Sequence, residues 1–524
     1  MNIRQFDMCE KLSQVSGSSK RQFVNCMAAV MVWGMIAHGY IFLNALFSHD
    51  SLNEFNADEF GNEWKIQLGR VLVPLYRAVV RGDITMPWLI GIISLVYIGI
   101  AVFIVVKIFD IRSRLGIILA AGIFTVNITV ISQAATYIND MDCNMLALLM
   151  AVLSVYMWRN YKRGFLYGMV PVGIAIGLYQ SYISVAVTLI IMVCIIDLLE
   201  YKKFHTVFNN GIKGIAMLIG GGVIYFILVK VVLSFTGISL ITGKYNSLSN
   251  VFEQSVIDML KLVKDEYIYT LLEFITVPSM YSAAMYIQGI AACLTIIFII
   301  RRISSKKIGI KEKVISIILI LLLPLGMNIS YILVGGMSHD LMIFAVWLVY
   351  LFAYLIADKI GTLSIKGNTG NRISAIIIGI MIFVVLWGNV QLANEAYLKK
   401  NIEHESNNML FTRVIYDLEK NSDSNEQVIF VGTPNNEFLY KPGFENVSTL
   451  TGMGSNYVLV ASNYERCLAY FNYIAAYPIN LAPEEKWEEY MKRQEVKEMP
   501  VYPEDGSIRE IDGIVVVKLG NTEE

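Results

Sequence analysis

Long apolar segments alternate with short polar ones along most of the chain. Eleven apolar segments can be placed between charged or turn-forming residues, at positions 23–47, 87–109, 115–138, 143–158, 165–178, 182–199, 214–235, 278–300, 314–334, 341–357 and 374–390. Repeated apolar runs of about twenty residues are typical of helices that cross a membrane. The pattern therefore predicts a polytopic α-helical membrane protein with about eleven transmembrane helices.

The longest polar stretch before residue 200 is the loop 48–87, which holds many charges in a chain where charge is scarce. In its second half, apolar residues recur at helical spacing and the arginines fall on the opposite face: Trp64, Leu68, Leu72, Leu75 and Val79 against Arg70 and Arg77. This amphipathic pattern predicts one helix that lies in the membrane surface with its arginines turned inward.

Lysine and arginine are concentrated in alternate loops, which predicts that the N-terminus, 1–22, is cytoplasmic. The transmembrane domain, 23–391, then places the loop 48–87 and the polar turns 139–142, 179–182 and 338–340 on the exterior. The exterior loop 237–277 has the rhythm of a second surface-lying helix. After the last span, segments typical of strands and helices predict a small extracytoplasmic α/β domain over 392–524.

Composition supports the membrane class and excludes some functions. Hydrophobic residues make up 56% of the chain, charged residues 16%, and the mean hydropathy is +0.55. The net charge of −1, with no basic tract, argues against nucleic acid as a partner. None of the six cysteines is spaced for metal binding, so neither a zinc site nor a disulfide framework is expected.

Acidic residues at span ends are candidates for acid–base chemistry. Asp50 follows the first span, where a partly desolvated carboxylate could take a proton from a sugar hydroxyl, although Ser48-His49-Asp50 could equally cap a helix. Asp140 and Asp142 could position hydroxyls or bind a divalent cation, or could simply keep a tight turn in water. His339 and Asp340 form a similar polar turn.

Arginines and aromatic residues complete the set of candidates. Arg70 and Arg77 could hold a phosphate, because a guanidinium matches phosphate oxygens in a bidentate manner. For Arg77 and Arg81, contact with lipid headgroups is the commoner role. Tyr179, Gln180 and Tyr182 could stack on and hydrogen-bond a sugar, or belong to an interfacial aromatic belt.

Several of these motifs occur together in one known family. Ser48-His49-Asp50, the sequence WKIQLGR from Trp64 to Arg70, Pro87-Trp88, GLYQSYIS at 177–184 and NEAYLK at 394–399 resemble the bacterial glucosyltransferase II family, which includes serotype-converting O-antigen glucosyltransferases. The resemblance implies a GT-C type membrane glycosyltransferase that inverts the anomeric carbon. It also implies Asp50 as the base, whereas the family often has a second acid where this chain has His49.

The function implied is transfer of a sugar, with glucose expected, from undecaprenyl phosphate to a cell-envelope polysaccharide on the outer face of the bacterial cytoplasmic membrane. In this hypothesis Arg70 and Arg77 bind the donor phosphate. The residues expected to bind the substrates are His49, Trp64, Asp140, Asp142, Tyr179, Gln180, Tyr182, His339 and Asp340. A divalent cation is a further candidate ligand. The alternatives are a polysaccharide polymerase or ligase, a transporter or flippase of lipid-linked sugars, and a membrane scaffold.

Overall fold

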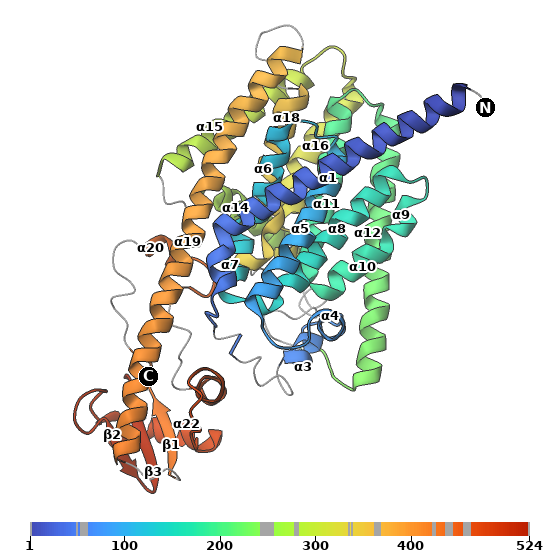
Figure 1. The fold of residues 1–524 in the computed structure, drawn as a ribbon. Helices are drawn as coiled ribbons and strands as arrows, with labels where there is room; N and C mark the ends of the chain where they lie inside the picture. The colour runs from blue at the N-terminus through green and yellow to red at the C-terminus, as the bar shows by residue number, and fades with distance from the viewer. Residues whose placement is uncertain are drawn as a thin grey trace.

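A computed structural model shows a bundle of helices with a small sheet at one end (Figure 1). It describes residues 3–48, 51–52, 61–241, 256–276, 282–333, 336, 339–360, 368–421, 426–434, 444–453 and 463–521. The helices up to residue 200 are α1 Ile3–Leu43, α3 Gly61–Gln67, α4 Val73–Val80, α5 Pro87–Phe109, α6 Arg114–Thr125, α7 Ile128–Thr136, α8 Met141–Asn160, α9 Gly164–Tyr167, α10 Met169–Leu178 and α11 Ile183–Leu199.

The remaining helices are α12 Phe204–Thr236, α14 Val256–Thr276, α15 Ser282–Ile303, α16 Ile310–Met327, α17 Ile329–Leu333, α18 Leu348–Ile360, α19 Asn368–Asn421, α20 Glu445–Ser448, α21 Tyr464–Ala469, α22 Glu484–Lys492 and α23 Gln494–Lys497. Short 3₁₀ turns lie at Ile138–Asp140, Gln180–Tyr182, Asp340–Met342 and Phe344–Trp347, and a π-helical turn at Tyr470–Ile474. The helix expected within 237–277 is α14.

Seven of the described helices are long and apolar enough to cross a membrane, or eight if the bent pair α6 and α7 counts as one span. The chain is therefore a membrane protein by the character of its helices, while the predicted number of eleven spans is not confirmed. Several predicted spans are interrupted by polar residues. At residue 127, the Asn127 side chain accepts a hydrogen bond from the backbone N–H of Val130 and so begins α7, at an angle of 43° to α6.

Loops far apart in the sequence gather at two ends of the bundle. At one end lie α3, α4 and the sheet, below the bundle in Figure 1. Asp140, just before α8, contacts Lys65 of α3 and Arg77 of α4 and so belongs to the same end. At the opposite end, Lys359 pairs with Glu200 at 3.0 Å, and the Arg302 side chain donates to the Leu199 carbonyl. The two groups match the predicted exterior and cytoplasmic sets, although which side faces the cytoplasm remains a prediction.

The core lies among the helices of the bundle, and one buried histidine joins three of them. The Nε2–H of His38 in α1 donates to the Thr125 carbonyl of α6 at 2.9 Å. Its Nδ1 therefore accepts from the Tyr397 hydroxyl of α19, at 2.6 Å. His38 and Tyr397 are both fully buried, so this pair of bonds fixes how α19 packs against the bundle.

The long helix α19 continues beyond the bundle to a three-stranded sheet in the order β1-β3-β2 (Figure 1). The strands are β1 Gln427–Val431, β2 Ile508–Ile511 and β3 Ile514–Lys518, with β1 parallel and β2 antiparallel to β3. The strand expected at QVIFVG is β1. Most of the terminal strand expected at IDGIVVVKL is β3. Its first residue instead ends β2, because Asp512 and Gly513 both have positive φ and form the two-residue turn of a hairpin.

Candidate active site

The segment after residue 60 forms two short helices joined by a turn, so the prediction of one continuous in-plane helix was wrong. Gly69 has a φ of +77°, the left-handed conformation that ends a helix. The backbone N–H of Arg70 bonds to the Lys65 carbonyl at 2.8 Å, and that of Gly69 to the Ile66 carbonyl at 2.9 Å. This pair of bonds is a Schellman motif, which ends α3 and places Arg70 immediately after the turn.

Three cationic side chains from this segment converge on one carboxylate, that of Asp140. Arg77 Nη2 lies 2.7 Å from Asp140 Oδ1, Lys65 Nζ contacts Oδ2, and Arg70 Nη1 is 3.7 Å from Oδ2. Asp140 precedes the first turn of α8, where the partial positive charge of the helix N-terminus also favours an anion. The cluster is largely buried, with 7% of the Asp140 side chain exposed.

A second ion pair lies beside the first and is completely buried. Arg81 Nε donates to Asp142 Oδ2 at 2.8 Å, and its other nitrogens donate to backbone carbonyls of Gly82, Ile84 and Asn139. The Tyr76 hydroxyl donates to the same carboxylate at 3.1 Å. Burial, and then the nearby Asp142 charge, raise the pKa of Tyr76 well above its usual value, so this phenol stays protonated.

Arg70 differs from Arg77 and Arg81 because its guanidinium makes no hydrogen bond to the residues that the structure describes. Its guanidinium carbon lies 4.3 Å from the centroid of the Tyr179 ring, a cation–π contact. Its 3.7 Å approach to Asp140 is an ion pair but exceeds hydrogen-bond range, and 15% of the side chain is exposed. Arg70 therefore has a fixed position and N–H groups that an incoming anion can use.

Gln180 of the 179–182 turn and Tyr225 of α12 hold the backbone turn that precedes Arg70. Gln180 Nε2 donates to the Leu68 carbonyl at 2.9 Å, and the Tyr225 hydroxyl donates to the Gly69 carbonyl at 3.1 Å, so both hold the turn that carries Arg70. Tyr182 is buried, and its hydroxyl accepts a hydrogen bond from Gln133. In this structure Gln180 and Tyr182 thus contact protein groups, where the sequence predicted sugar contacts.

Asp340 joins the bundle to the segment 444–453, which contains α20. Its carboxylate accepts from the backbone N–H of Thr451 at 2.7 Å and from the Ser132 hydroxyl at 3.3 Å. The Thr136 hydroxyl in turn donates to the Thr451 carbonyl at 3.3 Å. Thr136 also accepts a hydrogen bond, through its carbonyl, from the hydroxyl of Ser48. The C-terminal part of the chain therefore contacts the end of the bundle that carries the ion pairs.

Other predicted site residues are placed as follows. His49 and Asp50 lie outside the described residues. Trp64, in α3, has 39% of its surface exposed, and His339 is half-buried beside Asp340. The structure thus brings Arg70, Arg77, Asp140, Asp142 and Tyr179 together, while Asp340 contacts the segment 444–453.

Two expectations for charged residues are wrong. Arg77 and Arg81 do not touch lipid headgroups, because both are buried and paired with carboxylates. Of the two alternatives left open for Asp140 and Asp142, the solvated turn is wrong for the same reason. The sequence reasoning also missed Lys65 and Arg81 as members of the cluster. The spacing of Arg77 and Arg81, four residues apart on one helix face, was the available signal.

The acidic pair does not fit a divalent cation in this arrangement. Three cationic side chains already surround Asp140, and Arg81 occupies Asp142, so a metal ion would have to displace them. Among the described residues, no three His, Cys, Asp or Glu side chains gather as a metal site would require.

Fold and site together define the class of this protein: a polytopic helical membrane protein whose buried ionic groups gather at one end of the bundle. Comparison with known families then identifies it further, because the model of the family described as Glucosyl transferase GtrII matches residues 39–357, and the chain belongs to that family. The matched range contains the whole ionic cluster. Membership makes the protein a glycosyltransferase, with glucosyl transfer as its general activity.

Neither the curated proteins nor the solved structures contain a match to the chain.

Proposed function

We propose that the protein transfers glucose from a polyprenyl-phosphate donor to a hydroxyl of a cell-envelope polysaccharide on the outer face of the bacterial cytoplasmic membrane. The observation that carries this proposal is the geometry of Arg70. A guanidinium that is positioned by an aromatic ring and a carboxylate, yet keeps free N–H donors, suits an anion that arrives and leaves. The phosphate of a lipid-linked sugar is such an anion.

The chemical step is a single displacement at the anomeric carbon. The acceptor hydroxyl gives its proton to a carboxylate base and its oxygen attacks the sugar C1. The bond between C1 and the phosphate oxygen breaks, and the lipid phosphate leaves with the bonding electrons. Arg70 would stabilise the charge that develops on this oxygen, which is worth several kcal/mol in a low-dielectric site. Inversion of C1 follows from the single attack.

The proposed base is Asp50, on the strength of its place after the first apolar segment. Ser48, two residues before Asp50, is buried and donates to the carbonyl of Thr136, which lies four residues before Asp140 in the sequence. Arg77, Lys65 and Arg81 have a supporting role in the proposal. They neutralise Asp140 and Asp142, and Asp140 in turn attracts Arg70.

The acceptor would lie beneath the segment 444–453. Thr451 contacts both Asp340 and Thr136, and the Lys399 ammonium of α19 donates to the carbonyl of Met453. This segment therefore packs against both the bundle and α19 at the end that carries the cluster. A glycan held there would reach the donor without entering the bundle.

The test is an assay of purified protein with polyprenyl-phosphate glucose and envelope glycan. Arg70→Gln should lower kcat/KM by about 10²–10³, and Arg70→Lys should recover only part of it, because an ammonium lacks the bidentate fork. Asp50→Asn should abolish turnover while the protein stays in the membrane fraction. Arg112→Gln, an exposed arginine paired with Asp110, is the matched control.

Near-normal turnover of Arg70→Gln would remove Arg70 from the reaction, and near-normal turnover of Asp50→Asn would do the same for Asp50. Transfer of whole repeat units but not of single glucose residues would indicate a polymerase or ligase. Movement of the lipid-linked sugar from one leaflet of a vesicle to the other, without formation of a glycan product, would indicate a transporter.

A further inference from the structure

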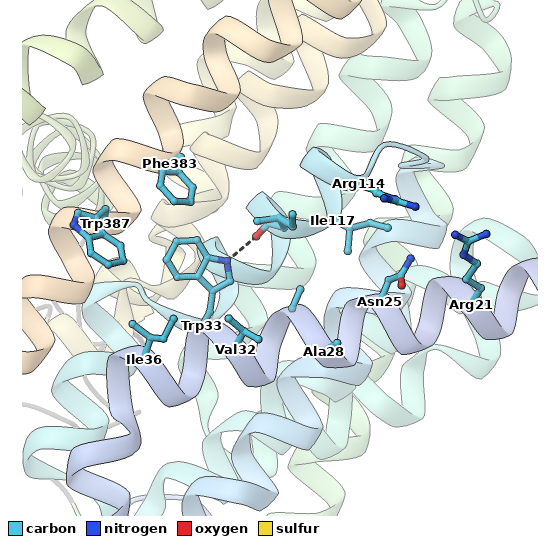
Figure 2. A pocket seen from close by; sticks show the side chains of 12 residues that line it. Arg21, Asn25, Ala28, Val32, Trp33, Ile36, Arg114, Ile117, Phe383 and Trp387 are labelled. Atoms are coloured by element: carbon cyan, nitrogen blue, oxygen red, sulfur yellow. Dashed lines mark hydrogen bonds between the residues drawn. The ribbon is translucent and has the colours of Figure 1, made fainter.

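A groove on the side of the bundle has no part in the proposed reaction. It is a cavity of about 540 Å³ between α1, α6 and α19, and none of its lining residues belongs to the ionic cluster. Figure 2 shows two kinds of side chain at its two ends. Arg21, Asn25 and Arg114 form one end, and Trp33, Phe383 and Trp387 form the other.

The polar end carries two arginines from facing elements. Arg21 of α1 and Arg114 of α6 are both exposed, and neither has a hydrogen bond or ion pair with another residue that the structure describes. By contrast, Arg112, two residues before Arg114, is paired with Asp110 at 2.7 Å. Two neighbouring guanidinium groups without carboxylates repel each other, so this end of the groove favours a phosphate.

The other end is apolar and opens sideways. Trp33 forms its floor, and the indole N–H of Trp33 is already bonded to the Ile118 carbonyl at 3.0 Å, so the ring offers only an apolar face. The walls lie on the outer surface of the bundle, with 42% of Phe383, 44% of Trp387 and 48% of Ile36 exposed. The groove is thus reached from the lipid rather than from the interior of the bundle.

The length of the groove matches one leaflet of a bilayer. Arg21 lies near the beginning of the candidate span Ser19–Leu43, and Trp33 is twelve residues further along α1. At 1.5 Å per residue the two are about 18 Å apart along the helix axis. Half of the hydrocarbon thickness is about 15 Å. A ligand with its charge at Arg21 would therefore bring its tail close to the membrane midplane at Trp33.

We propose that this groove binds one anionic phospholipid, with its phosphate between Arg21 and Arg114 and one acyl chain along Trp33 to the rings of Phe383 and Trp387. Charge complementarity selects the occupant, since the groove pairs unneutralised guanidinium groups with an apolar wall of leaflet length. Both arginines lie outside the predicted spans, in segments of the sequence predicted to be cytoplasmic, where the membrane surface is rich in anionic lipid. The bound lipid would hold α1, α6 and α19 together.

The experiment measures lipid retention by native mass spectrometry and the unfolding temperature of the full chain in neutral detergent. Phosphatidylglycerol should be retained as one molecule and should raise the unfolding temperature, whereas phosphatidylcholine with the same chains should not. The double variant Arg21→Gln/Arg114→Gln should weaken retention on the order of 30-fold, because each arginine attracts an anionic lipid by about 1 kcal/mol. Arg112→Gln should retain the lipid as the natural chain does.

Three further measurements separate the possible sources of the effect. Trp387→Ala leaves both arginines in place and should still weaken lipid retention, because the acyl chain loses part of its apolar contact. This variant also tests the proposal if the double arginine variant does not fold. An equal rise in unfolding temperature with glycerol phosphate would overturn the proposal in favour of a simple anion site. A change of oligomeric state on altering the arginines, without selective lipid retention, would overturn it in favour of a second copy of the chain.

Discussion

Asp142 and Arg81 form an ion pair in which neither side chain reaches solvent. The carboxylate accepts three hydrogen bonds, from the Tyr76 hydroxyl, from Arg81 and from the backbone N–H of Cys143. Such a pair is costly to desolvate and contributes little net stability, but removing one partner leaves a buried, uncompensated charge. At the scale of single residues, this pair is where a substitution should do the most damage without touching substrate.

Arg81→Met should lower the free energy of unfolding by about 3–5 kcal/mol, because the Asp142 carboxylate loses its counterion and three backbone carbonyls lose their donor. The measurement is the unfolding temperature in detergent. Adding Asp142→Asn to the same chain should restore part of the loss, since the buried charge is then gone.

Arg112→Met is the matched control, because the Arg112–Asp110 pair is exposed and should contribute nothing measurable. An unfolding temperature for Arg81→Met as high as that of Arg112→Met would contradict the importance of the buried pair.

The partners of these charges could not be predicted from the sequence. Arg70 and Arg77 stood out as inward-facing arginines and Asp140 as a candidate acid, but more than sixty residues separate the two groups. Only the packing of α3 and α4 against the start of α8 brings them together. Apolar periodicity shows which face of a helix is buried, and it does not show which other helix the face will meet.

At the scale of elements, the turn between α3 and α4 determines where Arg70 lies. Gly69 at a φ of +77° is the residue that allows the Schellman bonds to form, and the next residue is Arg70. Gly69→Ala should destabilise the turn by about 1–2 kcal/mol, the cost of the left-handed conformation for a residue with a Cβ. We expect a fall in glucosyl transfer that exceeds the fall in unfolding temperature, because Arg70 shifts.

Gly69→Asn is the control for this prediction, since asparagine tolerates the left-handed conformation better than alanine does. It should retain more activity than the alanine variant. Equal activities for the two variants would show that backbone conformation at this position does not control the site.

Element boundaries show why some sequence predictions succeed. The span predicted at 87–109 is α5, Pro87–Phe109, because proline favours the first turn and the apolar run is unbroken. The prediction of one in-plane helix was wrong because the apolar spacing continues across Gly69, although the backbone at this glycine ends the helix. The strand predicted at 511–519 is confirmed as β3 over 514–518, but the turn at Asp512-Gly513 was missed, although this dipeptide is a strong turn signal.

At the scale of the whole molecule, the stability of the folded chain should depend on pH through Asp340. Burial raises the pKa of Asp340 above its usual value, although the hydrogen bonds from Thr451 and Ser132 and the charge of His339 oppose the shift. A raised carboxyl pKa means that the folded state binds the proton more tightly than the unfolded state does. Its contribution to stability is therefore lost as pH rises from the usual value of about 4 through the raised pKa.

The measurable consequence is a lower unfolding temperature in detergent as the pH increases through this window. The hydrogen bonds from Thr451 favour the ionised carboxylate, so they reduce this dependence without reversing it. Asp340→Asn cannot ionise, so the unfolding temperature of the natural chain relative to that of Asp340→Asn should fall as the pH rises. A difference that grows with pH, or that stays constant, would contradict the prediction.

The long helix α19 has a consequence for how the length of this chain can vary. It runs without interruption from Asn368 to Asn421 and is held at Tyr397 by His38. Each residue added or removed beyond that point would turn everything that follows by about 100° and move it by about 1.5 Å. The segment 444–453 must still return to Thr136 and Asp340. Insertions or deletions in the distal part of α19 should therefore be tolerated only in steps close to whole helical turns, which return the sheet to nearly the same orientation relative to the bundle.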